Sequence, residues 1–212
     1  MIISKTKNLS QGGKVFSMKL VCLGDSLTSG YGVFKEDCWV SLIRDLLKIE
    51  VLNKGINGDT MPGMLSRSYR DVVKNHPTHV IILGGSNDFM AGRRLKLVTD
   101  NLTEIIKESL NEGIIPIVGT EPIIDKTLAE RKWDGTVDYD KINILLNHYR
   151  NWILDFCTKN NIHYIDFHHC FLEKSKISSN NSLFIDGIHP TKTGHKLIAE
   201  CIIKFFNETP IK

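Results

Sequence analysis

The sequence predicts an α/β domain, a three-layer α/β/α sandwich with about five parallel strands in its central sheet. Two observations support this prediction. Short apolar runs alternate with longer amphipathic stretches along the chain, and no internal repeat or low-complexity linker interrupts the alternation. Strands that alternate with helices are typical of βαβ units, whose parallel strands are buried on both faces of the sheet.

The first half of the chain holds three expected strands and two expected helices. Residues 19–24 are an apolar run that ends in glycine, as a buried strand does. Residues 37–49 place their apolar side chains on one face at helical spacing, and residues 51–53 predict a short second strand. Residues 60–75 are expected to be helical, because a proline is tolerated in the first turn. Residues 79–83 (HVIIL) predict the third strand.

The second half continues the alternation. Residues 95–110 predict a helix, which a following glycine ends. Residues 114–118 predict a strand despite an internal proline, whose missing N–H is then not needed by a neighbour. Residues 138–160 form the longest expected helix, residues 163–167 a strand and residues 191–206 the last helix. This order fits a doubly wound, flavodoxin-like sheet, in which ligands bind at the carboxyl ends of the strands.

Composition excludes several classes of protein. The 212 residues fit one domain, and the net charge of +3 is too small and too dispersed to indicate nucleic-acid binding. The five cysteines are odd in number and widely spaced, so they predict reduced thiols in a cytoplasmic protein. No apolar run is long enough to span a membrane. Residues 1–17 lack the apolar core of a signal peptide and are expected to be a flexible extension, so that residues 18–212 form the domain.

Serine and glycine residues follow the first expected strand. Ser26 lies in Gly24-Asp25-Ser26-Leu27, where a tight turn can project its hydroxyl from the edge of the sheet. A serine after a strand is more often the N-cap of a helix. The motif is neither the G-x-S-x-G elbow nor a glycine-rich phosphate loop.

Three further blocks carry side chains suited to acyl transfer. The second strand runs into NKGINGDT, where Gly58 can offer a backbone donor to an oxyanion, and the third runs into GGSND, where Asn87 offers an amide. Each block alone reads equally well as an ordinary turn. Near the C-terminus, Asp186 and His189 lie three residues apart, so the carboxylate can hold one ring nitrogen while the other acts as a base. A helix cap beside a surface histidine is the simpler alternative.

Together the four blocks resemble those of the SGNH or GDSL-type hydrolase superfamily, in the family's order and over residues 18–206. The members closest in pattern are the bacterial lysophospholipase, thioesterase and arylesterase-like enzymes. The resemblance implies Ser26 as nucleophile, His189 as base and Asp186 as its partner. It also implies an oxyanion hole formed by the Ser26 N–H, Gly58 and Asn87. GGSND is one residue longer than the GGND of some members, but it keeps Asn87 in register.

Other residues near these blocks have weaker assignments. Asp25 and Asp88 are expected to hold loops, and the adjacent histidines at 168 and 169 lack the partners that a metal site needs. The connection 120–137 is either solvated or a pocket wall that carries Ile123 and Trp133. Phe89 and Met90 are candidates for contacting an acyl chain.

The expected function is therefore a serine esterase or acylhydrolase that cleaves carboxylic esters, with thioesters and lysophospholipids as further candidates. It would work through an acyl-enzyme on a small-molecule ester, without a metal or an organic cofactor. One alternative is a carbohydrate O-acetylesterase with the same triad. An alternative of another class is a non-catalytic flavodoxin-like binding module. The oligomeric state stays open.

Overall fold

The computed structural model describes residues 9–11, 14–16, 18–177 and 183–209. Its central sheet has the strand order β4-β3-β5-β6-β7, and every neighbouring pair in it is parallel. This order is that of a flavodoxin-like, doubly wound sheet, so the predicted fold class is confirmed. The strands are β3 (Lys19–Gly24), β4 (Glu50–Gly55), β5 (His79–Leu83), β6 (Ile115–Gly119) and β7 (His163–Ile165).

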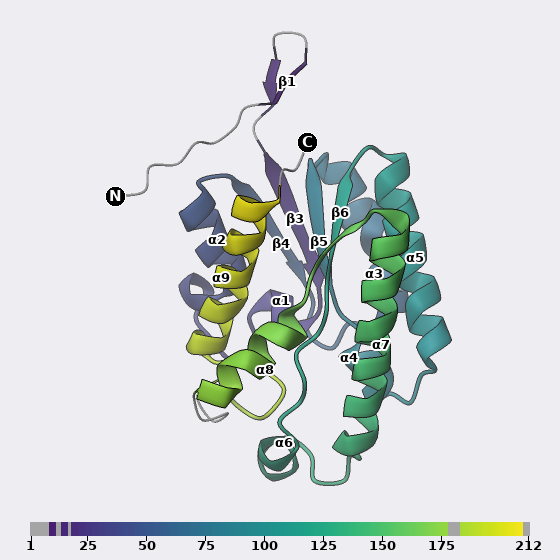
Figure 1. Ribbon diagram of the computed structural model, residues 1–212, viewed down its shortest axis with the longest axis vertical. Helices are drawn as coiled ribbons and strands as arrows, with labels where there is room; N and C mark the ends of the chain where they lie inside the picture. The colour runs from purple at the N-terminus through teal and green to yellow at the C-terminus, as the bar shows by residue number, and fades with distance from the viewer. Residues whose placement is uncertain (1–8, 12–13, 17, 178–182, 210–212) are drawn as a thin grey trace.

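Helices cover both faces of this sheet. Figure 1 shows α2 and α9 on one side of the sheet and α3, α5 and α7 on the other. The longer helices are α2 (Trp39–Leu47), α3 (Met61–Asp71), α5 (Leu95–Asn111), α7 (Tyr139–Asn160), α8 (Phe167–Ile177) and α9 (Lys192–Glu208). The shorter ones are α1 (Ser26–Ser29), α4 (Ser86–Met90), α6 (Lys126–Lys132) and the 3₁₀ turns η1 (Lys35–Asp37) and η2 (Val73–Asn75).

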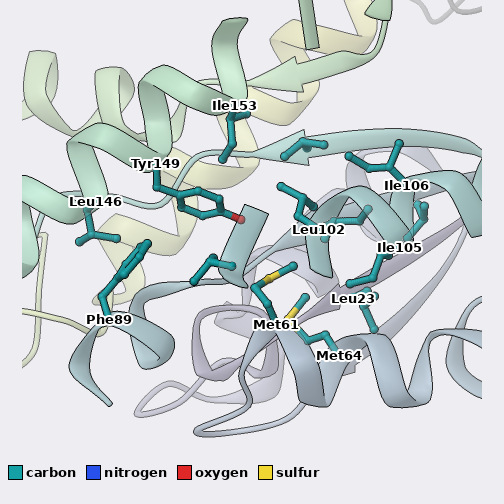
Figure 2. Close-up of a cluster of buried hydrophobic side chains, with 14 of the residues drawn as sticks. Leu23, Met61, Met64, Phe89, Leu102, Ile105, Ile106, Leu146, Tyr149 and Ile153 are labelled. Atoms are coloured by element: carbon teal, nitrogen blue, oxygen red, sulfur yellow. The ribbon is translucent and has the colours of Figure 1, made fainter. Parts of the chain in front are cut away.

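Alternation along the central strands divides the core in two. In β3, Val21 and Leu23 face one layer of helices, while Leu20 and Cys22 face the other. This period of two is what a strand buried on both faces requires. Figure 2 shows the first layer, in which side chains from α3, α5 and α7 meet over the sheet; they include Met61, Met64, Leu102, Ile105, Leu146, Tyr149 and Ile153.

The structure differs from the expected elements in several places. The strand expected at 163–167 ends at Ile165, because α8 begins at Phe167. The helix expected at 60–75 ends at Asp71 and gives way to η2. The connection 120–137 contains the short helix α6. Residues 1–17 were expected to be a flexible extension, but within them β1 (Leu9–Gln11) pairs antiparallel with β2 (Lys14–Phe16). The other residues of this segment lie outside the described part of the chain.

Candidate active site

The four sequence blocks meet at the carboxyl edge of the sheet. β3 comes first along the chain and lies between β4 and β5 in the sheet. The strand that follows it in sequence, β4, is on one side of it, and the next strand, β5, is on the other. The turns that follow these three strands carry Ser26, Gly58 and Asn87. In doubly wound folds this switch point is where ligands bind.

Local geometry explains why glycine precedes Ser26. A side chain on Gly24 would place its Cβ 2.6 Å from the carbonyl oxygen of Leu83 on β5, which is closer than any real contact. After this close approach, α1 starts at Ser26 itself. The carboxylate of Asp25 caps the helix by accepting a hydrogen bond from the Leu27 N–H at 2.9 Å. Ser26 is thus the first residue of α1, and its side chain lies at the edge of the sheet. The residue is 6% exposed.

His189 connects Ser26 to Asp186 through hydrogen bonds. Its Nε2 lies 3.1 Å from the Ser26 Oγ, and its Nδ1 lies 2.7 Å from Oδ2 of Asp186. All three residues are buried. Because Nδ1–H donates a hydrogen bond to the carboxylate, Nε2 keeps its lone pair and is free to accept the serine proton. The geometry is that of a nucleophile, a base and a group that orients the base.

Hydrogen bonds also hold the Asp186 side chain in place. Its second oxygen, Oδ1, accepts hydrogen bonds from the backbone N–H groups of Ile188 at 3.0 Å and His189 at 2.8 Å. Burial alone would raise the pKa of Asp186, but hydrogen bonds from the His189 ring and these N–H groups outweigh it and lower the pKa. Asp186 therefore stays ionised and can balance the positive charge of an imidazolium at His189.

Two aromatic rings flank His189. The ring centroids of Tyr31 and Trp133 lie 4.3 Å and 4.9 Å from that of the imidazole. Trp133 is 47% exposed, and with Tyr31 and Asp186 it lines an open depression of about 650 Å³. The structure thus brings Trp133, a candidate pocket residue, to the edge of the site.

The candidate oxyanion donors differ in whether their N–H groups are already engaged in hydrogen bonds. Among the described residues, none accepts a hydrogen bond from the backbone N–H of Ser26 or of Gly58. Gly58 has a φ of +74°, which favours glycine. Both N–H groups of the Asn87 amide, in contrast, are engaged. They donate to the backbone oxygen of Asp59 at 2.9 Å and to Oδ2 of Asp25 at 3.2 Å.

The remaining pocket candidates lie away from this site. Phe89 is 1% exposed and packs edge to face against Tyr149, as Figure 2 shows, so its ring belongs to the core. In α4, residues two apart point in different directions, so Asn87 and Phe89 cannot share a target. Met90 is half-buried against the same core, and the half-buried Ile123 is not among the residues that line the depression.

Arg67, a buried residue of α3, was not among the residues that sequence patterns singled out. Its guanidinium donates to the carbonyl oxygens of Gly24 at 2.9 Å and Lys54 at 2.8 Å, and it forms ion pairs with Asp59 and Asp71 at 2.7 Å and 3.0 Å. These bonds join the ends of β3 and β4 to the turn that holds Gly58. Only Asp71 lies at a regular helical spacing from Arg67, and Gly24, Lys54 and Asp59 do not, so no short motif marks the arrangement.

Acidic side chains also hold the loops around the site. Asp88 is fully buried and accepts hydrogen bonds from the Met61 N–H at 2.8 Å and from Arg93 at 3.0 Å, which joins α4 to the start of α3. This placement agrees with a loop-holding role. Across the described ranges, no three side chains of the ligating types cluster as a metal site would require. No helix in those ranges has the length and apolar character needed to cross a membrane.

Comparisons with known proteins agree with this geometry. Residues 22–197 match the model of the GDSL-like lipase/acylhydrolase family. An arylesterase of Vibrio mimicus is 29% identical, over 88% of this chain and 86% of its own length. An acetylxylan esterase of Geobacillus stearothermophilus is 23% identical, over 88% and 92%. A lipolytic G-D-S-L protein of Veillonella parvula shares the fold, with a TM-score of 0.78 and 24% identity over 91% of this chain and all of that one. The chain therefore belongs to the GDSL-like lipase/acylhydrolase family and is an ester-hydrolysing enzyme.

Proposed function

We propose that Ser26 is the nucleophile of this esterase, that His189 is its general base and acid, and that Asp186 orients the imidazole. The observation that carries the proposal is the unbroken hydrogen-bond chain from Asp186 through His189 to the Ser26 Oγ, with distances of 2.7 Å and 3.1 Å. Membership in a family of ester-hydrolysing enzymes removes the alternative of a non-catalytic binding module.

The reaction begins when Nε2 of His189 takes the proton of the Ser26 hydroxyl, and Oγ attacks the carbonyl carbon of the ester. The negative charge that develops on the carbonyl oxygen is stabilised by the N–H groups of Ser26 and Gly58, which are free to donate. Asn87 supplies a third donor by turning one N–H away from its present partner. The longer of its two bonds, to Asp25, is the one that the oxyanion replaces.

The intermediate then collapses, and the imidazolium of His189 gives its proton to the leaving alcohol. Water repeats the cycle on the acyl-enzyme, with His189 again as base, and releases the acid. The rings of Tyr31 and Trp133 pack against the imidazole and help to hold it in place during these proton transfers.

The position of Trp133 supports a substrate with a planar or ring-shaped leaving group. The leaving oxygen must lie at His189, so the group attached to it extends toward Tyr31 and Trp133. Aryl esters, the substrates named for the Vibrio relative, fit such a wall by stacking. Thioesters and lysophospholipids share the chemistry but gain nothing from these rings.

A carbohydrate O-acetylesterase is the second candidate. An exposed tryptophan beside a catalytic base also suits the apolar face of a sugar ring, and one relative is named as an acetylxylan esterase. The acyl group in that case would be acetyl. The two candidates differ in the leaving group and share the triad.

The triad is tested with Ser26→Ala on p-nitrophenyl acetate, where we expect turnover to fall to background while the fold stays intact. Undiminished turnover would refute the assignment. The leaving group is tested by comparing aryl, alkyl and sugar esters of one acid. Trp133→Ala should lower the preference for aryl over alkyl acetate by about 3- to 10-fold, the value of a lost aromatic contact. Trp152→Phe, which lies within α7 and stacks on Phe156, is the control.

We also propose a cytoplasmic location. All five cysteines are free thiols, and Cys170 and Cys201 among them are partly exposed. Such thiols are typical of a reducing compartment. Fractionation of the producing cells tests this proposal, since recovery outside the cytoplasm would contradict it.

A further inference from the structure

Two carboxyl groups are buried side by side beneath the candidate active site. Asp25 follows β3 and is 0% exposed, and Glu121 follows β6 and is 4% exposed. The two carboxyl groups lie close enough for one of them, when protonated, to donate a hydrogen bond to the other. In the part of the chain that the structure describes, neither forms an ion pair with a lysine or arginine. The triad and the oxyanion donors leave this pair without a role.

The hydrogen bonds around the pair lead to the oxyanion hole. Asp25 accepts from the Leu27 N–H at 2.9 Å and from the Asn87 amide at 3.2 Å. One oxygen of Glu121, Oε2, accepts from the Ser86 N–H at 3.1 Å. Asn87 is thus held from two directions, through its own side chain and through the backbone of the preceding residue.

The second oxygen of Glu121, Oε1, is fully buried and no group donates a hydrogen bond to it. If both carboxyl groups were ionised, this oxygen would be unpaired and repelled by the neighbouring carboxylate. A proton on Glu121 removes both penalties, because the resulting O–H donates to Asp25. One proton for two carboxyl groups is therefore the arrangement that satisfies the buried atoms.

The charges around the pair agree with this placement. Burial and then the charge of Asp25 raise the pKa of Glu121 well above its usual range. Burial raises the pKa of Asp25 to about 6, although hydrogen bonds from the Leu27 N–H and from Glu121 oppose the rise. The other titratable groups that face the pair are His189 and Asp59 from neighbouring turns and Tyr149 from α7, with the His168 ring of α8 against the backbone of Glu121.

We propose that Asp25 and Glu121 share one proton, and that this proton leaves Asn87 able to serve as an oxyanion donor. The proposal rests on the proposed function of Ser26 and Asn87. With Glu121 donating to it, Asp25 carries only part of a charge and holds Asn87 by a long hydrogen bond. The amide can then turn one N–H toward the oxyanion.

Loss of the shared proton to solvent changes both parts of this arrangement. Asp25 becomes a full carboxylate and binds the Asn87 amide more tightly, so the amide is withheld from the oxyanion. The pair also gains a second negative charge close to the place where the oxyanion forms. An additional unit charge at this range lowers the rate on the order of tenfold. Asp25 and Glu121 are thus positioning residues, which act on the reaction through Asn87.

The activity test compares wild type with Glu121→Gln over alkaline pH. In the wild type we expect kcat to fall roughly tenfold as the pair loses its proton, with KM little changed. The glutamine amide donates permanently to Asp25, so Glu121→Gln should have a severalfold lower kcat that no longer falls in this range. Glu108→Gln is the control, because its carboxylate bonds to Ser68 between α3 and α5, and it should behave as wild type. A flat wild-type profile, or an alkaline fall that survives in Glu121→Gln, would overturn the proposal.

A second measurement does not depend on turnover. The infrared difference spectrum between wild type and Glu121→Gln at neutral pH should contain the carbonyl stretch of a protonated carboxyl group, and the Glu108→Gln spectrum should lack this difference. Absence of the band would show that both carboxyl groups are ionised and would overturn the shared proton. Labelling of Ser26 by a fluorophosphonate separates this failure from a failure of the triad itself.

Discussion

Replacing Arg67 with methionine removes the cation that holds the site together while it keeps most of the buried volume. The guanidinium is 7% exposed and makes ion pairs with Asp59 and Asp71, together with hydrogen bonds to the carbonyl oxygens of Gly24 and Lys54. Methionine fills the space of the aliphatic stem but donates no hydrogen bond. The variant therefore isolates the polar contribution of Arg67.

The expected loss of stability follows from those partners. Removing one member of a buried ion pair typically costs about 3–5 kcal/mol, because the other charge is left buried without compensation. Asp59 keeps a bond from the Thr60 N–H, and Asp71 keeps its bonds from Arg70, so part of the charge stays satisfied. We therefore expect the free energy of unfolding of Arg67→Met to fall by about 3 kcal/mol, the lower end of that range. The same change should lower kcat, since the turns carrying Ser26 and Gly58 lose their common anchor.

Urea denaturation of the variant and of wild type measures this difference. The matched control is Arg70→Met, because Arg70 bonds to the same carboxylate of Asp71 but its side chain is 67% exposed. An exposed pair contributes little, so the control should unfold close to wild type. If the free energy of unfolding of Arg67→Met falls by less than about 1 kcal/mol, or by no more than that of the control, the bonds of Arg67 do not stabilise the fold.

Three further predictions concern single sites. Asn87→Ala should lower kcat by about 10²–10³ with a small change in KM, as the loss of one oxyanion donor does, and a KM-only effect would contradict it. Gly187→Ala should destabilise the fold in thermal unfolding, because the glycine has a φ of +93° and an added Cβ would lie 2.5 Å from the Ala129 N. In the folded state Glu121 keeps its proton at pH values where the unfolded chain has lost it, because burial and Asp25 raise its pKa. The free energy of unfolding of wild type relative to Glu121→Gln should therefore fall as the pH rises from about 4 through the raised pKa of Glu121. The fall is at most about 1.4 kcal/mol per pH unit, and a difference that stays constant with pH would contradict this.

Elements with a simple local cause were predictable from the sequence. The strands at 19–24 and 79–83 match β3 and β5, because continuous apolar runs bounded by glycine have few other structures to adopt. The start of α8 could not be seen from the sequence, because the helix follows β7 after a single residue and no glycine or proline separates the two. The packing of Phe89 against Tyr149 could not be seen from the sequence, because its closeness to Asn87 along the chain conceals the turn of α4 between them.

At the site, the sequence indicated the candidate reacting groups but not the side chains that hold them in place. Ser26, Gly58 and Asn87 follow the ends of β3, β4 and β5, which the parallel sheet brings to one edge. His189 lies between α8 and α9, outside that pattern. Arg67 bonds to Gly24, which is 43 positions away, and Asp25 pairs with Glu121, which is 96 positions away. Contacts of this kind depend on the folded backbone. Sequence spacing carries no information about them.

The most direct test of the triad is covalent labelling with a fluorophosphonate, followed by mass spectrometry of the digested protein. We predict a single adduct, on Ser26, which forms at the same rate as activity is lost. His189→Ala should slow its formation strongly, because Nε2 at 3.1 Å is the only described base in contact with that hydroxyl. Full activity after complete labelling, or an inactivating adduct on another residue, would contradict the assignment of Ser26 as nucleophile.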